Sequence, residues 1–221
     1  MQPGLATVQG VLEEIVGGIE GRPVHVAGSG RTDAGVHALA QVAAFTIENP
    51  ITADNLRRAV NRLLPPAIRV LDAKEMHADF HPRFDAVAKT YRYLLHRAEI
   101  CPPFEWRFVH HHPYPLDEAA MMAGAPVFTG EHDFSAFAAA DERYAPGQSQ
   151  IRTILSSDLV RHGDRMVYTV RGSGFLKHMV RNLVGTLLEV GRGNMTGTSI
   201  PQKSGPTAPA KGLTLVSVEY P

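Results

Sequence analysis

The sequence predicts an α+β fold built from two related halves that share one sheet. Two observations support this prediction. The first is that helix and strand patterns follow one another as helix, strands, helix and strand. The second is that the same order then repeats. In folds of this class, helices gather on one face of a largely antiparallel sheet. The second run starts at Ala88, so we place the division near residue 79, with an N-terminal subdomain at 1–79 and a C-terminal subdomain at 80–221.

Length and composition limit the classes of protein to consider. The chain has 221 residues, enough for one domain or two small ones, and its 22 basic and 22 acidic residues cancel. This balance excludes a polybasic tail and an acidic disordered chain, and it argues mildly against nucleic-acid binding. Arginine supplies 17 of the 22 cations, which reflects either codon usage or a need for phosphate contacts. No apolar run is long enough for a membrane span, no signal peptide is evident, and the single Cys101 fits a reducing cytoplasm.

The N-terminal half is expected to begin with a helix. Thr7 can cap this helix, and Gly21 with Pro23 can end it. Its apolar residues recur at the spacing of one helical face: Val8, Val11, Leu12, Ile15 and Ile19. A short strand is predicted at 24–27, followed by a glycine-punctuated loop at 28–35.

The rest of this half is expected to contain a strand, a helix and a strand. The first strand is predicted at 42–47. Thr52 can cap the helix, and Pro65 with Pro66 would stop it. The segment 68–75 has the pattern of a strand.

The C-terminal half repeats this organisation. A strand is predicted at 88–97 because residues that favour strands dominate it, and a helix is expected from near Leu116. Two paired strands are predicted at 153–160 and 166–171, with a turn at 162–164 between them.

The best helical pattern of the chain spans 175–190, and Gly191 marks its end. One face of it carries apolar side chains: Leu176, Met179, Val180, Leu183, Val184, Leu187 and Leu188. The last strand, at 213–220, is apolar on both faces, which predicts that it is buried within the sheet.

The loop at 28–35 is the most informative candidate site. Asp33 lies two positions after Arg31 and among small residues, which would let a bulky substrate approach its carboxylate. The glycine spacing fits neither a dinucleotide-binding loop nor a P-loop. The structural alternative is that Asp33 caps nearby backbone N–H groups in an Asx-type turn.

A strand and a helix supply further candidates. Lys89, Tyr91 and Tyr93 share one face of the predicted strand, and Arg92 points to the other. An aromatic ring beside cations suits base stacking with phosphate contact, although ordinary sheet packing gives the same pattern. Arg181 lies near the middle of the helix at 175–190, off its apolar face. It can point to solvent or pair with a carboxylate in a site.

Two histidine-containing segments invite other interpretations. Adjacent side chains of 110–112 alternate in an extended segment, so three histidines there favour a solvated or partner-facing loop over a metal site. The segment 131–133, Glu-His-Asp, offers acid–base groups for substrate contact, or it anchors a turn on the core beside Phe134 and Phe137.

Six blocks, taken together and in order, resemble the tRNA pseudouridine synthase A family. They cover nearly the whole chain, and the Arg-Thr-Asp-Ala-Gly-Val-His string within the first is highly specific. The blocks are Gly30–Ala38, Asn61–Val70, Phe80–Tyr93, Gly130–Phe137, Phe175–Gly185 and Gly205–Leu213.

The resemblance implies a cofactor-free isomerase that converts uridine to pseudouridine at positions 38–40 of the tRNA anticodon stem-loop. By this resemblance Asp33 is the catalytic aspartate and Arg181 is the basic residue that pairs with it. Tyr91 is the tyrosine that stacks on the target base, and Arg31 is the arginine associated with flipping the uridine out of the stack. No metal is implied.

The resemblance also implies a fold and an assembly. Two ferredoxin-like (RRM-like) halves would form one mixed, mainly antiparallel sheet, with helices on one face and a cleft between the halves. The protein would be a homodimer that binds tRNA. From the resemblance we expect that, relative to the family pattern, an N-terminal strand and a short segment after Gly193 are missing. The alternative function is therefore a truncated, non-catalytic tRNA-binding paralogue.

Overall fold

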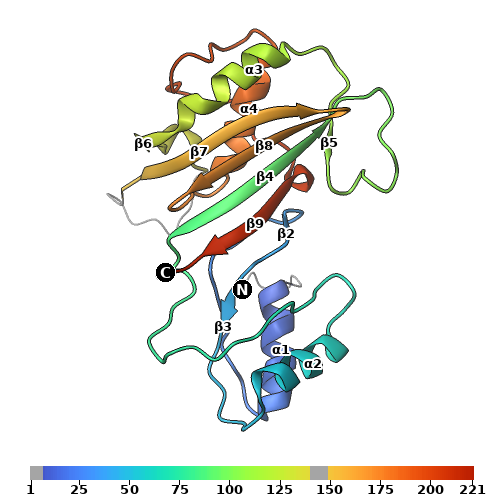
Figure 1. Ribbon diagram of the computed structural model, residues 1–221, viewed down its shortest axis with the longest axis vertical. Coiled ribbons are helices and arrows are strands. Elements are labelled where there is room, and N and C mark those ends of the chain that lie inside the picture. Colours follow the sequence, from blue (N-terminus) through green and yellow to red (C-terminus); the bar gives the residue numbers. More distant parts are fainter. Residues whose placement is uncertain (1–6, 140–148) are drawn as a thin grey trace. The chain divides into compact units, whose positions relative to one another are not determined.

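The computed structural model describes residues 7–139 and 149–221, and within them the chain forms two compact units (Figure 1). Unit 1 comprises the chain up to Arg31 together with Val42–Asp85. Unit 2 comprises Thr32–Gln41 and Ala86–Pro221. The chain therefore passes from one unit to the other three times, at 31/32, 41/42 and 85/86.

Unit 1 contains the two predicted helices. In α1 (Val8–Glu20), the Thr7 side chain accepts a hydrogen bond from the Gly10 N–H, and the helix ends at Gly21 with φ of 79°. In α2 (Ala53–Leu63), the Thr52 side chain caps the Asn55 N–H. Both helices pack around one apolar cluster, whose buried members are Val16, Val24, Leu56, Val60 and Leu64.

The strands of unit 1 are shorter than the sequence predicts. Among the described residues of unit 1, β1 (Ala27–Gly28) and β3 (Ala43–Ala44) pair in antiparallel orientation, and the segment 68–75 is not a strand. The prediction of a strand at 68–75 was wrong, and at Val70 the backbone bonds to a side chain where a strand would form a ladder. The Asn61 amide donates to the Val70 carbonyl at 2.7 Å and accepts from the Val70 N–H at 2.9 Å.

Unit 2 is organised around a seven-stranded mixed sheet in the order β2-β9-β4-β8-β7-β6, with β5 also paired to β4. The strands are β2 (His37–Ala38), β4 (Ala88–His96), β5 (His110–His111), β6 (Gly130–Asp133), β7 (Ile151–His162), β8 (Arg165–Gly172) and β9 (Leu213–Glu219). The β2–β9 and β4–β5 pairs are parallel and the others are antiparallel. The β7–β8 hairpin and the interior position of β9 confirm the sequence predictions.

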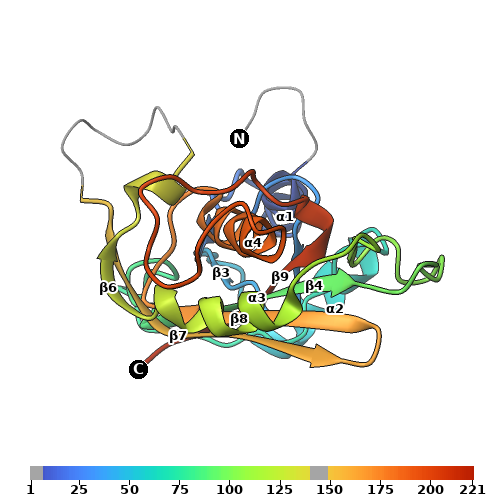
Figure 2. The same cartoon turned by 90° about the horizontal axis from the view of Figure 1, so that it is seen from above.

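Two helices, α3 (Glu118–Gly124) and α4 (Met179–Gly191), lie on one face of this sheet (Figure 2). Apolar side chains of α4 enter one core with those of β4 and β8, including Tyr93 and Tyr168. The helix predicted at 175–190 begins later than expected because His178 has a left-handed backbone, with φ of 62°. Arg181 is therefore in the first turn of α4 and not near its middle.

The α+β class, the mixed and mainly antiparallel sheet of unit 2 and the helices on one of its faces are confirmed. The ferredoxin-like halves, the single shared sheet and the subdomains at 1–79 and 80–221 stay predictions. None of the helices in the described ranges has the length and apolar character needed to cross a membrane.

Candidate active site

Asp33 is held at one edge of the unit 2 sheet by its own loop. Four residues after it, β2 pairs with β9, and the Leu39 N–H donates to the Leu215 carbonyl at 2.8 Å. The Val36 N–H closes a turn on the Asp33 carbonyl at 3.0 Å, and Gly35 supplies the positive φ of 82° that this turn requires. The small residues around Asp33 thus build a turn that fixes its backbone and leaves its side chain 27% exposed.

Arg181 approaches the same carboxylate from the first turn of α4. Its Nη1 donates to Asp33 Oδ2 at 2.8 Å, across 148 residues of sequence. Its Nε donates to the Ala208 carbonyl at 2.7 Å, and the Ala208 N–H donates back to the Arg181 carbonyl. The Arg181 side chain is 15% exposed and that of Asp33 is 27% exposed, so water screens this pair less than it screens a fully exposed ion pair.

The segment that supports Arg181 is packed closely against α4. A Cβ at Gly185 would lie 1.7 Å from the Pro206 carbonyl oxygen, so only glycine allows this approach. The buried Asn182 side chain accepts a hydrogen bond from the Thr207 hydroxyl at 2.7 Å. These contacts fix the backbone beside Ala208, and hence the guanidinium of Arg181.

His178 also contacts Asp33, which sequence reasoning missed. Its Nε2 lies 3.4 Å from Asp33 Oδ2, and its side chain is 28% exposed. Its left-handed backbone costs about 1–3 kcal/mol for a non-glycine residue, although histidine tolerates it better than most. The helical pattern that runs through 175–190 hides this backbone conformation, so no periodicity signal could have identified the contact.

Tyr91 lies on β4, on the face of the sheet that α4 covers. Its ring packs edge-on against Phe175, with 5.1 Å between ring centroids. Burial, and secondarily the negative charge of Asp33, raise the pKa of Tyr91 to about 12. The phenol is therefore neutral at physiological pH, and its environment includes the Asp33 carboxylate. Tyr93 shares this face and donates its hydroxyl proton to the Pro209 carbonyl at 2.8 Å.

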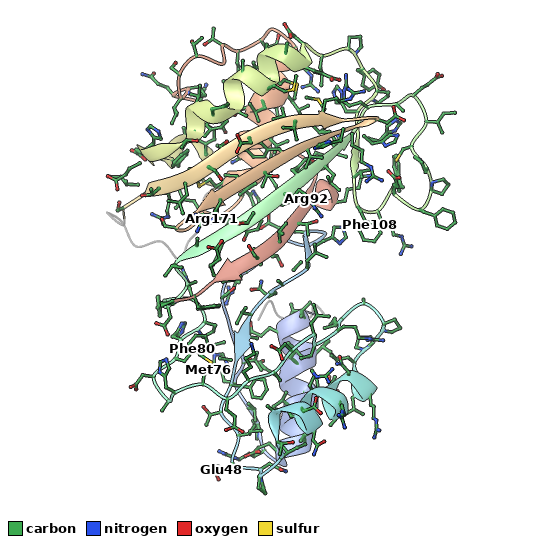
Figure 3. The ribbon with its side chains drawn as sticks, viewed as in Figure 1. Glu48, Met76, Phe80, Arg92, Phe108 and Arg171 are labelled. Carbon is green, nitrogen blue, oxygen red and sulfur yellow. The ribbon has the colours of Figure 1, made fainter. Side chains whose placement is uncertain are left out.

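Two other arginines considered from the sequence, Arg31 and Arg92, have different surroundings. Arg31 is exposed and is the last residue of its segment of unit 1, two positions before Asp33. Arg92, labelled in Figure 3, lies on the opposite face of the sheet from Tyr91 because adjacent strand residues alternate. It lines a cavity of about 550 Å³ with residues such as Glu105 and Arg165. The position of Arg92 on the face away from Tyr91 agrees with the alternation expected along this strand.

The histidine tract at 110–112 is not a solvated loop. His110 and His111 form β5 beside β4, and His112 is buried. The imidazoles have separate surroundings: His111 Nε2 contacts the Ala98 carbonyl, and His112 Nδ1 contacts Arg97. Burial, followed by nearby positive charges, lowers the pKa of His110 to about 4. Over residues 7–139 and 149–221, no three His, Cys, Asp or Glu side chains are grouped to hold a metal ion.

The segment at 131–133 makes local bonds that favour an anchoring role over substrate contact. The Asp133 carboxylate accepts from the Ser135 N–H at 2.8 Å, and His132 Nε2 contacts the Thr129 carbonyl at 2.9 Å. The neighbouring Phe134 and Phe137 are fully buried. These polar side chains therefore secure the turn that carries two core aromatics.

Comparison with known proteins gives a family for this arrangement. A family model described as tRNA pseudouridine synthase matches residues 2–85 and 125–221. The chain belongs to this family. The tRNA pseudouridine synthase A of Solibacter usitatus is 72% identical to it over 221 residues, spanning 100% of this chain and 92% of the relative. The enzymes of the same name from Brevibacillus brevis and Syntrophotalea carbinolica are 40% and 42% identical, spanning 100% and 99% of this chain and 92% and 89% of those relatives.

Proposed function

We propose that the protein is a tRNA pseudouridine synthase that isomerises uridines 38–40 of the anticodon stem-loop, with Asp33 as its catalytic carboxylate. The observation that carries this proposal is the Arg181–Asp33 contact of 2.8 Å, which joins two of the blocks that resemble the family. Membership of the tRNA pseudouridine synthase family supports the reaction class.

The reaction requires little beyond a positioned carboxylate. The N1–C1′ glycosidic bond breaks, the base turns, and a C5–C1′ bond forms. C5 then releases its proton, and N1 gains one, so that no oxidant or reductant is consumed. The target nucleotide must leave the helical stack for a carboxylate to reach it. Asp33, on a turn of small residues and partly exposed, can meet an extruded nucleoside.

Arg181 and Tyr91 have complementary roles in this proposal. Arg181 balances the charge of Asp33 and orients the carboxylate, because its guanidinium is itself fixed by the Ala208 carbonyl. Tyr91 and Phe175 form an edge-on aromatic pair on the same face of the sheet. The Tyr91 ring offers a surface on which the detached base can stack while it turns.

The finer parts of the proposal concern recognition and assembly. Arg31, exposed and two positions before Asp33, would help to hold the uridine out of its stack. The protein would act as a homodimer on tRNA in the cytoplasm, without a cofactor.

The deciding assay is tritium release from tRNA carrying [5-³H]uridine. Wild-type protein should release tritium as water, and Asp33→Ala should release none above background. Asp158→Ala is the matched control, because Asp158 is an exposed aspartate on β7 and its loss should change nothing. Equal release by wild type and Asp33→Ala would refute the assignment of Asp33.

The same assay separates the alternative, a non-catalytic tRNA-binding paralogue. That protein would bind tRNA with an affinity that falls as salt rises, yet it would release no tritium. A tRNA in which cytidine replaces uridines 38–40 tests the position, because release should then disappear.

A further inference from the structure

We propose that His178 is a positioning residue for Asp33, holding one carboxylate oxygen so that the other faces the nucleoside. The inference deepens the proposed function and rests on it. Three features of the structure support it: the shared oxygen, the backbone conformation of His178 and the rigidity of its surroundings.

The first feature is that two side chains contact the same atom. Arg181 Nη1 lies 2.8 Å from Asp33 Oδ2, and His178 Nε2 lies 3.4 Å from it. A carboxylate with a single contact can rotate about that contact. Two contacts on one oxygen restrict the orientation of the carboxylate plane. Neither of these contacts uses Oδ1. The 3.4 Å distance is long for a hydrogen bond, as is common for catalytic contacts before substrate binds.

The contact does not require a charged imidazole. The Nε2–H of a neutral histidine can donate to Oδ2, and so can that of the protonated ring. Arg181 already supplies a positive charge at this oxygen. His178 therefore orients the carboxylate, and this role differs from the charge-balancing role of Arg181.

The second feature is the backbone of His178, which among the described non-glycine residues is the one with positive φ, at 62°. The residue immediately precedes α4, as the helix's N-cap, and makes no side-chain cap hydrogen bond there. Helical continuation would direct its side chain back along the helix surface. The unusual conformation instead accompanies the contact with Asp33, and strained residues of this kind concentrate at functional sites.

The third feature is that both sides of His178 are anchored. The Met179 N–H donates to the Leu176 carbonyl at 3.1 Å, and the Asn182 N–H donates to the His178 carbonyl at 3.0 Å. Leu176 and Met179 are buried in the core of unit 2. The imidazole is thus presented from a rigid support, as precise placement of a reacting group requires.

The backbone conformation suggests the test variants. His178→Gly removes the imidazole and permits the positive φ, so the fold should be kept. His178→Gln retains an N–H donor of comparable reach. The control, His162→Gly, removes an exposed imidazole at the end of β7. For each variant we would measure the melting temperature, the tRNA Kd with unlabelled tRNA, and kcat and KM by tritium release.

We expect His178→Gly to melt within a few degrees of wild type and to bind tRNA with unchanged Kd. Its kcat should fall by roughly 10- to 100-fold with KM nearly unchanged, because misplacement of a reacting group slows the chemical step and leaves binding intact. His178→Gln should recover part of the loss, and His162→Gly should match wild type.

Three results would overturn the inference. A kcat for His178→Gly within twofold of wild type would exclude a positioning role. A fall in melting temperature that accounts for the lost activity would show a structural role, and a weaker Kd would show direct contact with RNA. If wild type itself releases no tritium, the proposed function fails, and that result is distinct from all three.

Discussion

The Asp33–Arg181 pair predicts that substitutions at these two positions have non-additive effects on stability. Arg181→Ala removes the hydrogen bonds to Asp33 and to the Ala208 carbonyl, whereas Asp33→Ala removes the first of these and the His178 contact. A hydrogen bond to a charged group contributes about 1.5–3 kcal/mol. Because the Asp33 side chain is 27% exposed, we expect a coupling free energy near the low end, about 1–2 kcal/mol.

Urea unfolding of the wild type, both single variants and the double variant measures this coupling. The matched control is a second cycle that combines Asp33→Ala with Arg171→Ala. Arg171, also labelled in Figure 3, pairs with Glu219 and should be independent of Asp33. Independent sites add within about 0.3–0.5 kcal/mol, so a coupling below that limit for Asp33 and Arg181 would refute the reasoning.

Four other predictions concern ionisation, packing and helix capping. Burial disfavours the Tyr91 phenolate, so the folded state keeps its full stability with respect to this group below pH 10 and loses stability as pH rises from 10 towards 12. Tyr91→Phe should therefore make that part of a stability profile measured by urea unfolding less steep, while Tyr93 and Tyr168, whose pKa values burial also raises, keep part of the slope. Asp33→Asn should lower the pKa of Tyr91 in an ultraviolet titration, but only in part because burial is the larger cause; an unchanged pKa would contradict their electrostatic contact. Gly185→Ala should unfold unit 2 or lower its melting temperature sharply, since the added Cβ overlaps the Pro206 carbonyl; wild-type melting would disprove the close approach. Thr7→Ala should cost about 1 kcal/mol of stability through loss of the α1 cap, whereas Thr7→Ser should retain it in calorimetry.

Much of the fold could be predicted from local sequence signals. Thr7 and Thr52 cap helices as expected, because capping depends on residues three positions away. The β7–β8 hairpin was recognisable from two strand patterns around Gly163, which has φ of 55°. The segment 68–75 was not predictable in this way. Its backbone bonds to Asn61, a side chain outside the segment, and strand patterns do not report such partners.

Some residues of the candidate site could likewise be predicted from the sequence, and others could not. Residue types and order, through the resemblance, led to Asp33, Tyr91 and Arg181, and the structure brings all three into unit 2. The His178 contact depends on one left-handed residue within an apparently continuous helical pattern. Alternation along β4 was enough to exclude Arg92 from the face of Tyr91.

The chain passes between its two units three times, and this limits where chimeric proteins can be joined. Residues 32–41 belong to unit 2 but are encoded between two stretches of unit 1. A chimera cut at 85/86 would take Asp33 from one parent and Arg181 from the other, so the two halves of the ion pair would never have been selected together. A chimera with further junctions at 31/32 and 41/42 would take Asp33 and Arg181 from the same parent. Recombination that keeps the ion pair from a single parent therefore needs three junctions, at 31/32, 41/42 and 85/86.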